Sequence, residues 1–510
     1  MRIVFLPIDE RFCTREYFLM LAKASGLNIL TPPKELLGSK KIPADTDALK
    51  NWLLGNTREG DNLILSLETL IHGGLIPSRI NLLQKPTINE RLKILNTLKK
   101  KRTVIYLSST ITRIPIYNSS DEEPDYWEYY GETLSNLSKE FAKYLESKDK
   151  LQNLSYKDTL PRFLEKFKNK YQEISEWMIK DFFWRRERNY NIIQEAIKLV
   201  DNKTVDFLNI TLDDNSPGSL SVYESKQHQK LVNQLDLNEK ISIHPGADET
   251  SLTLLSRLLC STFKYSPSFE LFYTHPESIT LIPPYEGYPL KSSVETHIEA
   301  AGGKIKQKGD ILLLLNNSSD YSRYDIIFHD ILQDTLTVSV EEAYKTIIER
   351  IKKEDKIIGI ADIRYGNGSD TRLVEKLLKN HLDWLKINYS GWNTVSNTLG
   401  TVILHSIIQY FAQKNYLKLD TKELLKLQAI FFIEHWGYQA VVRQQLRKDS
   451  AQKGCNIWTL MPAEKWAEEY TRTKLLPFKE IIEKSMKKRW KMEIFFPWHR
   501  SFEVGINLFP

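Results

Sequence analysis

Residues 205–215 read Val-Asp-Phe-Leu-Asn-Ile-Thr-Leu-Asp-Asp-Asn, a short apolar run that ends in two carboxylates and an amide. This pattern predicts a β-strand over 205–212. Similar runs recur in the first half of the chain, at 2–8, 28–31, 62–67, 103–108 and 240–244, and the stretches between them predict helices. Nearly continuous apolar strands that alternate with helices indicate an α/β fold with a parallel sheet, either barrel-like or doubly wound.

The alternation is interrupted once and then restarts. Residues at about 131–200 predict a helical insertion rich in charge and aromatic side chains. Four further strands are expected at 268–273, 311–315, 356–363 and 385–389. We therefore predict a barrel-like α/β domain over 1–264 that carries the insertion, a second smaller α/β domain over 265–392, and a mainly helical C-terminal region over 393–510.

Composition places the chain among ordinary globular proteins. Its 510 residues are long for one core, and its hydrophobic (41%) and charged (27%) fractions are typical. The net charge of +6 comes without a dense basic block, which argues against a nucleic-acid partner. Three scattered cysteines indicate no disulfide framework, and no apolar stretch approaches the roughly 18 residues of a membrane span. We expect a cytoplasmic protein without a membrane partner, and the sequence sets no oligomeric state.

Polar side chains follow most of the predicted strands, at the end where parallel α/β folds bind ligands. A single Asp after a strand is more often a helix N-cap than a catalytic group. The repetition over five or six strands nevertheless favours one shared polar site. Besides Asp213 and Asp214, its predicted members are Asp9, Glu10, Arg11, Glu68, Arg79, Arg113, Asn215, Asp248, Glu249, Arg364, Asn367, Trp392, Asn393 and Asn397.

The adjacent carboxylates Asp213 and Asp214 are the centre of the predicted chemistry. Successive strand side chains point to opposite faces, so both can serve one site only where the strand ends and the chain turns. There one carboxylate can act as general acid or base while the other orients the substrate or stabilises charge, because close carboxylates raise one pKa. Acid–base pairs of this kind serve glycoside hydrolysis, and adjacent Asp residues occur in substrate-assisted hexosaminidases.

Aromatic residues in predicted loops offer stacking surfaces for sugar rings, although packing of the insertion explains them equally well. They are Tyr126, Trp127, Tyr129, Tyr130 and Trp392.

Two other functions fit the same residues. A hydrolase or isomerase dependent on a hard metal would use the carboxylates as ligands for Mg²⁺ or Mn²⁺. A non-catalytic protein would bind a sugar or small polar metabolite there. No zinc-ligand spacing, Gly-rich phosphate motif or nucleophile elbow is present in the sequence. We therefore expect a glycosidase-like enzyme without a cofactor that acts on a saccharide or other small molecule, with the metal enzyme and the binding protein as alternatives.

Seven stretches form a specific joint set: 6–11 (Leu-Pro-Ile-Asp-Glu-Arg), 66–79, 212–215 (Leu-Asp-Asp-Asn), 245–249 (Pro-Gly-Ala-Asp-Glu), 361–370, 391–397 and 497–503. Through this set the chain resembles, over nearly its whole length, an uncharacterised prokaryotic family, domain-of-unknown-function family 4127. The resemblance supports the positions of the site and implies no reaction. Glu68 departs from it, because an Asp is expected there, and the longer side chain weakens its case as a tight metal ligand.

Overall fold

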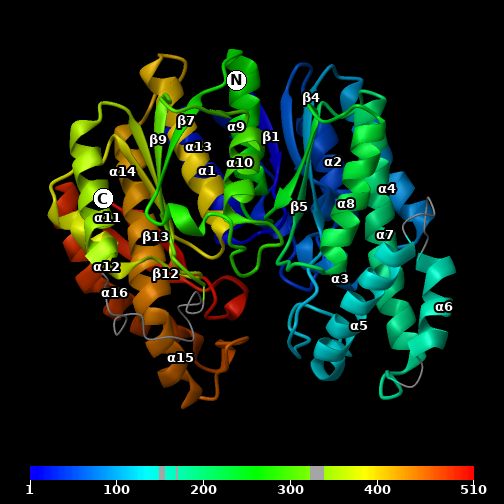
Figure 1. The fold of residues 1–510 in the computed structure, drawn as a ribbon. Coiled ribbons are helices and arrows are strands. Elements are labelled where there is room, and N and C mark those ends of the chain that lie inside the picture. The colour runs from blue at the N-terminus through cyan, green and yellow to red at the C-terminus, as the bar shows by residue number, and fades with distance from the viewer. Residues whose placement is uncertain (149–155, 168–169, 322–337) are drawn as a thin grey trace. The chain divides into compact units, whose positions relative to one another are not determined.

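The computed structural model describes residues 1–148, 156–167, 170–321 and 338–510. The chain forms two compact units (Figure 1). The first contains residues 1–10, 29–254 and 285–288, and the second contains residues 11–28, 255–284 and 289–510. Two pieces of the predicted insertion, 149–155 and 168–169, lie outside the described residues.

The first unit is organised around a six-stranded sheet in the order β2-β1-β3-β4-β5-β6. The pairs β1–β3, β3–β4, β4–β5 and β5–β6 are parallel. The strands are β1 (Arg2–Leu6), β2 (Asn28–Leu30), β3 (Asn62–Ser66), β4 (Val104–Ile111), β5 (Phe207–Leu212) and β6 (Ile241–Pro245). With β2 and β6 at its edges, the sheet is open, so the doubly wound alternative holds here and the barrel does not.

Helices cover this sheet and bury its apolar strands. Leu107 of β4 lies opposite Leu65 of β3 and Leu208 of β5, and all three are fully buried. α7 and α8 contact the strands, and α5 and α6 pack with them as the helical insertion. The helices are α2 (Thr46–Asn56), α3 (Leu75–Ile80), α4 (Lys85–Lys99), α5 (Trp127–Lys148), α6 (Tyr156–Phe167), α7 (Glu176–Asp201) and α8 (Leu220–Gln234), and α9 (Thr250–Phe263) runs from this unit into the second.

The second unit holds a five-stranded parallel sheet in the order β11-β10-β9-β7-β8. When its strands are numbered from one in chain order, this sheet has the order 2-1-3-4-5. The first five strands of the first sheet have the same order, and β6 is added beside β5. In such sheets ligands bind outside the carboxyl ends of the strands, near the point where the order reverses. The strands are β7 (Ser268–Tyr273), β8 (Lys304–Ile305), β9 (Ile311–Asn317), β10 (Ile357–Ile363) and β11 (Ile387–Ser390).

The rest of the second unit is mainly helical and ends in an antiparallel hairpin that the sequence analysis did not predict, β12 (Lys491–Phe495) and β13 (Gly505–Phe509). A π-helix (Phe432–Val442) joins α14 to α15. The helices are α1 (Tyr17–Ala24), α10 (Leu290–Ala300), α11 (Val338–Lys353), α12 (Thr371–Lys379), α13 (Val395–Gln413), α14 (Thr421–Phe431), α15 (Arg443–Ala451) and α16 (Glu464–Met486).

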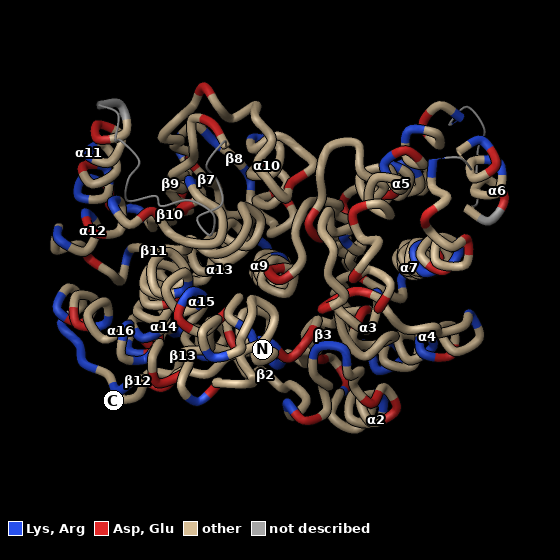
Figure 2. Tube along the Cα trace, turned by 90° about the horizontal axis from the view of Figure 1, so that it is seen from below, with Lys and Arg blue, Asp and Glu red and all other residues tan. Residues whose placement is uncertain are grey.

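The surface charges are mixed. Figure 2 shows basic and acidic residues interspersed along helices such as α7 and α16. None of the described helices is both long and apolar enough to cross a membrane.

Replacement of Leu107 by Ala should lower the free energy of unfolding by about 2–5 kcal/mol, because it opens a cavity in the centre of the sheet. Urea unfolding followed by circular dichroism measures this loss. Leu82→Ala is the matched control, since Leu82 is 60% exposed, and it should change the free energy by less than about 0.5 kcal/mol. Equal losses in the two variants would contradict the placement of β4 in the core.

Candidate functional site

Two buried arginines of the first unit hold together several of the predicted site residues. Arg79 lies on α3, and Arg113 follows β4 by two residues. α3 comes after a short π-helix (Glu68–His72) that Gly73 ends with a φ of 85°. A side chain at Gly73 would lie 2.7 Å from the backbone nitrogen of Ala44, so glycine is required for this close approach. The turn directs the chain into α3.

The arginines contact the two carboxylates that end β5. Arg79 Nη2 donates to Asp213 Oδ2 at 2.5 Å, and Arg113 Nη1 donates to Asp214 Oδ2 at 3.3 Å. Arg79, Arg113, Asp213 and Asp214, all predicted from the sequence, therefore belong to one network. Asp213 is the more tightly bound partner and the more buried one, with 10% of its side chain exposed against 39% for Asp214.

Two further carboxylates complete the network, and the sequence analysis did not assign them to the site. Glu122 Oε2 accepts from Arg79 at 3.0 Å and from Arg113 at 2.6 Å. Glu123 Oε1 accepts from Arg79 at 3.3 Å and from Arg113 at 3.2 Å. Two guanidinium groups thus lie among four carboxylates, which leaves a formal charge of −2 when all six are ionised. We call these six residues the arginine–carboxylate network.

The environment separates the two aspartates. Burial and the neighbouring Asp213 raise the pKa of Asp214 to about 6, although Arg113 and Arg79 oppose this rise. Burial also raises the pKa of Glu123. A cavity of about 20 Å³, large enough for one water, adjoins Arg79, Arg113 and Glu123. A substrate is too large for that cavity, so the partly exposed Asp214 is the group of this network that a substrate can reach.

A hard metal fits this network poorly. Mg²⁺ and Mn²⁺ need carboxylate oxygens that point to a common centre. Here one oxygen of each carboxylate receives guanidinium N–H groups instead, namely Asp213 Oδ2, Asp214 Oδ2, Glu122 Oε2 and Glu123 Oε1.

Glu68 makes its hydrogen bonds within the sheet. Its carboxylate accepts from Ser66 at 2.8 Å, from Ser109 at 3.1 Å and from the backbone nitrogen of Thr110 at 2.7 Å. Burial raises its pKa, and these hydrogen bonds oppose the rise. The side chain therefore ties the end of β3 to β4.

Other predicted members of the first unit also lie at strand ends. Asn215 donates to the carbonyl oxygens of Leu212 and Tyr285, which fixes the loop after β5. Glu10 accepts from the backbone nitrogen of Lys40 at 3.2 Å. Asp9 and Asp248 are buried after β1 and β6.

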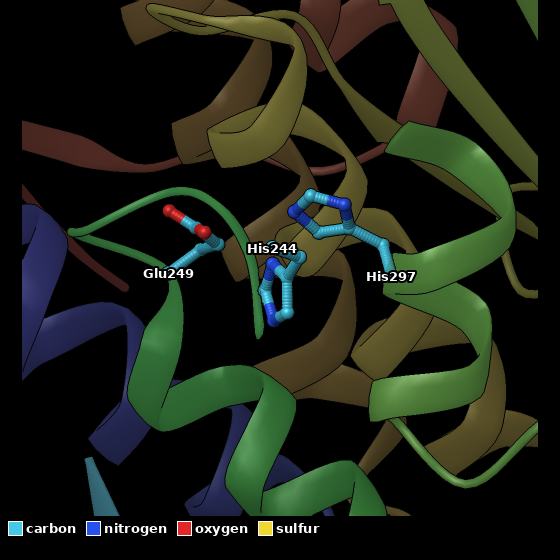
Figure 3. A group of neighbouring side chains, drawn as sticks. All are labelled: His244, Glu249 and His297. Carbon is cyan, nitrogen blue, oxygen red and sulfur yellow. The ribbon is translucent and has the colours of Figure 1, made fainter. Parts of the chain in front are cut away.

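Glu249 lies beside the network. Burial is the main cause that raises its pKa, and the negative charge of Asp213 raises it further. Figure 3 shows Glu249, just before α9, with His244 from β6. His244 Nδ1 is 2.7 Å from the carbonyl oxygen of Pro245, and His244 lowers the pKa of Glu249 in opposition to burial. His297, also drawn there, belongs to α10 of the second unit, where its Nδ1 is 2.7 Å from the Ser293 carbonyl oxygen.

Six predicted site residues belong to the second unit. Asn397 closes the capping box at the start of α13, where its Oδ1 accepts from Thr394 and from Asn393. The backbone nitrogen of Asn367 donates to the Asn393 carbonyl at 2.8 Å, and both residues have a positive φ. Together these bonds join the loops after β10 and β11.

The aromatic residues mostly pack in the interior. Trp392 is buried edge-to-face against Tyr17 and Phe502, and the guanidinium of Arg11 lies 4.5 Å from the ring centre of Trp498. Trp127, Tyr129 and Tyr130 were predicted in a loop but lie on α5, which begins at Trp127.

A second pair of carboxylates is buried at the end of β10. Asp362 accepts from Asn316 at 2.9 Å, from Tyr389 at 2.7 Å and from the backbone nitrogen of Asp370 at 2.8 Å. Tyr344 donates to Asp370, and Arg364 lies 3.5 Å from it. Burial and the charge of Asp370 raise the pKa of Asp362 to about 7. Only Arg364 of this cluster was predicted as a site residue.

The π-helix of the second unit carries another buried polar group. The backbone nitrogen of Gly391 donates to His435 Nδ1 at 3.2 Å, so the ring proton lies on Nε2, which faces the Tyr17 hydroxyl at 3.0 Å. Tyr17 in turn donates to Glu434 at 2.7 Å. These residues were not predicted as site residues, because a single Glu or His inside an apolar helix carries no motif.

The sequence matches the family of proteins of unknown function DUF4127 over residues 3–507. The chain belongs to this family. No curated protein matches it. Family membership covers both units and therefore all the residues described above.

Replacement of Arg79 by Met should destabilise the protein by about 3–5 kcal/mol, because it leaves buried carboxylates without their cation. Urea unfolding measures the loss. Arg102→Met is the control, since Arg102 is 85% exposed and pairs with the exposed Glu59, and it should cost less than about 1 kcal/mol. A loss in Arg79→Met no larger than in the control would show that the network does not stabilise the fold.

Asp214 should make stability depend on pH in a defined direction. Its folded pKa of about 6 lies above the unfolded value of about 3.9. The group therefore stabilises the fold at low pH and loses this contribution as pH rises through 6. The Asn side chain of Asp214→Asn does not titrate. The melting temperature of this variant minus that of the parent should therefore increase from about pH 4 to pH 7. The effect is moderated by water at this partly exposed side chain, and a difference that stays flat or falls would contradict the raised pKa.

Proposed function

We propose that this protein is a glycoside hydrolase or a related carbohydrate-active enzyme in which Asp214 is the proton donor and Asp213 its ionised partner. The observation that carries the proposal is the asymmetry of the pair. Arg79 holds Asp213 at 2.5 Å, whereas Asp214 has a longer contact at 3.3 Å, is partly exposed and has its pKa raised to about 6. Adjacent carboxyl groups with separated pKa values are the usual basis of acid–base roles.

The charge of the network supports a neutral or cationic substrate. Four carboxylates surround two guanidinium groups whose terminal Nη atoms already donate to them. A phosphorylated or carboxylated sugar would approach a negative surface at Asp214. Neutral glycosides and amino sugars meet no such repulsion.

In the proposed reaction Asp214 gives up one proton and regains one from water in each turnover. The Asp214 carboxyl gives its proton to the glycosidic oxygen as the bond from that oxygen to C1 breaks. Water then adds to C1 and returns a proton to the Asp214 carboxylate. Asp213, which is buried and held by Arg79, acts through its charge, which stabilises the positive charge that develops on the ring. In substrate-assisted hydrolysis an N-acetyl group of the sugar itself attacks C1 first.

Hydrolysis of chromogenic glycosides, N-acetylhexosaminides included, tests the proposal. Wild-type activity should fall above about pH 6, where Asp214 loses its proton. Asp214→Asn should lower kcat by about 10²–10⁴-fold, the usual contribution of a general acid. A loss of this size is expected for oligosaccharide substrates, and a smaller one for the chromogenic aryl glycosides, because their phenolate leaves with little protonation.

Asp125→Asn is the control, since Asp125 lies on the neighbouring loop with a fully exposed side chain. It should keep full activity. Activity that vanishes on chelation and returns with Mg²⁺ or Mn²⁺ would favour the metal-dependent alternative. Thermal stabilisation by a sugar without any turnover would favour a binding protein.

A further inference from the structure

The acidic loop of residues 118–126 is anchored in the first unit. Lys40 pairs with Asp121. The backbone nitrogen and the hydroxyl of Ser120 both donate to Glu128 on α5, at 2.8 and 2.9 Å. The anchored residues Ser120 and Asp121 directly precede Glu122 and Glu123, which are 6% and 5% exposed. Two buried glutamates are therefore held in place by an otherwise polar loop.

Glu122 and Glu123 contact the arginines in a crossed arrangement. One oxygen of each glutamate receives N–H groups from both Arg79 and Arg113. The same two guanidinium groups reach Asp213 and Asp214 with other nitrogens. The glutamates touch the arginines, and through the arginines they act on the aspartate pair.

We propose that Glu122 and Glu123 are positioning residues that keep a proton on Asp214 by sharing the two arginines that bind the aspartate pair. The proposal rests on the proposed role of Asp214 as the acid. The acidic loop would then have two roles: it would be anchored to the first unit, and it would keep Asp214 protonated.

The electrostatics of the neighbouring groups favour this role. Burial and Asp213 raise the pKa of Asp214, and Arg113 and Arg79 lower it. Tyr117 and both glutamates raise the pKa of Arg113, in opposition to its burial. Glu249 faces Asp213 from the segment after β6. If Arg79 and Arg113 were not also paired with the two glutamates, their positive charges would hold Asp214 ionised, since a nearby opposite charge lowers a carboxyl pKa by about one to three units. Two further carboxylates on the same guanidinium groups offset this attraction.

Carboxyl-carbon NMR of the full-length protein, labelled at aspartate Cγ, measures the effect, and Asp214→Asn assigns the signal. In Glu122→Gln and in Glu123→Gln the pKa of Asp214 should fall by about one unit, because one repulsive charge is lost and the arginines draw closer. The pH above which hydrolysis declines should be lower by the same amount, so activity at pH 7 should fall about tenfold. Glu122→Asp keeps the charge and should restore most of the shift.

Glu128→Gln is the matched control, because it loosens the same loop without touching an arginine. It should leave the pKa of Asp214 unchanged. Folded Glu122→Gln and Glu123→Gln proteins with the parental pKa would overturn the proposal, as would an equal shift in Glu128→Gln. If the pKa moves but no glycoside is cleaved, the proposed function fails and the positioning role stands. If Asp214→Asn abolishes cleavage while the glutamate variants keep the parental pKa, only the positioning role fails.

Discussion

The burial of two guanidinium groups among four carboxylates is the constraint around which the first unit is arranged. The side chains of Arg79 and Arg113 are only 4% and 13% exposed, and a buried charge is costly unless it is paired and hydrogen-bonded. The end of β4, α3, the acidic loop and the end of β5 must therefore meet at one point. The same arrangement that pairs the charges leaves Asp214 partly exposed beside Asp213.

The second unit meets a similar constraint with different chemistry. Its sheet has the same strand order, so polar side chains again collect at the carboxyl ends of the strands. The oxygens of Asp362 are satisfied by neutral donors from Asn316, Tyr389 and the backbone of Asp370. Burial and the charge of Asp370 raise the pKa of Asp362 to about 7, and these neutral donors offset only part of the rise.

Sequence patterns predicted the parallel sheets and the four network residues Arg79, Arg113, Asp213 and Asp214, because apolar runs and the charges that end them are local features. Glu122 and Glu123 escaped prediction, since a buried acid in a polar loop looks like an exposed one until its arginines are placed. Asn397 was predicted as a site residue from its strand-end position, and its observed bonds form a helix cap. The hairpin β12–β13 was missed because charged residues interrupt its short strands, as in Lys-Met-Glu-Ile-Phe.

Neutron diffraction from crystals of the full chain exchanged into heavy water at pH 5 tests the central claim most directly, because it locates protons on individual carboxyl oxygens. With an Asp214 pKa of about 6, the account predicts deuterium on Asp214 and none on Asp213, whose oxygen accepts from Arg79. Deuterium on Asp213 with Asp214 bare, or two bare carboxylates, would contradict it.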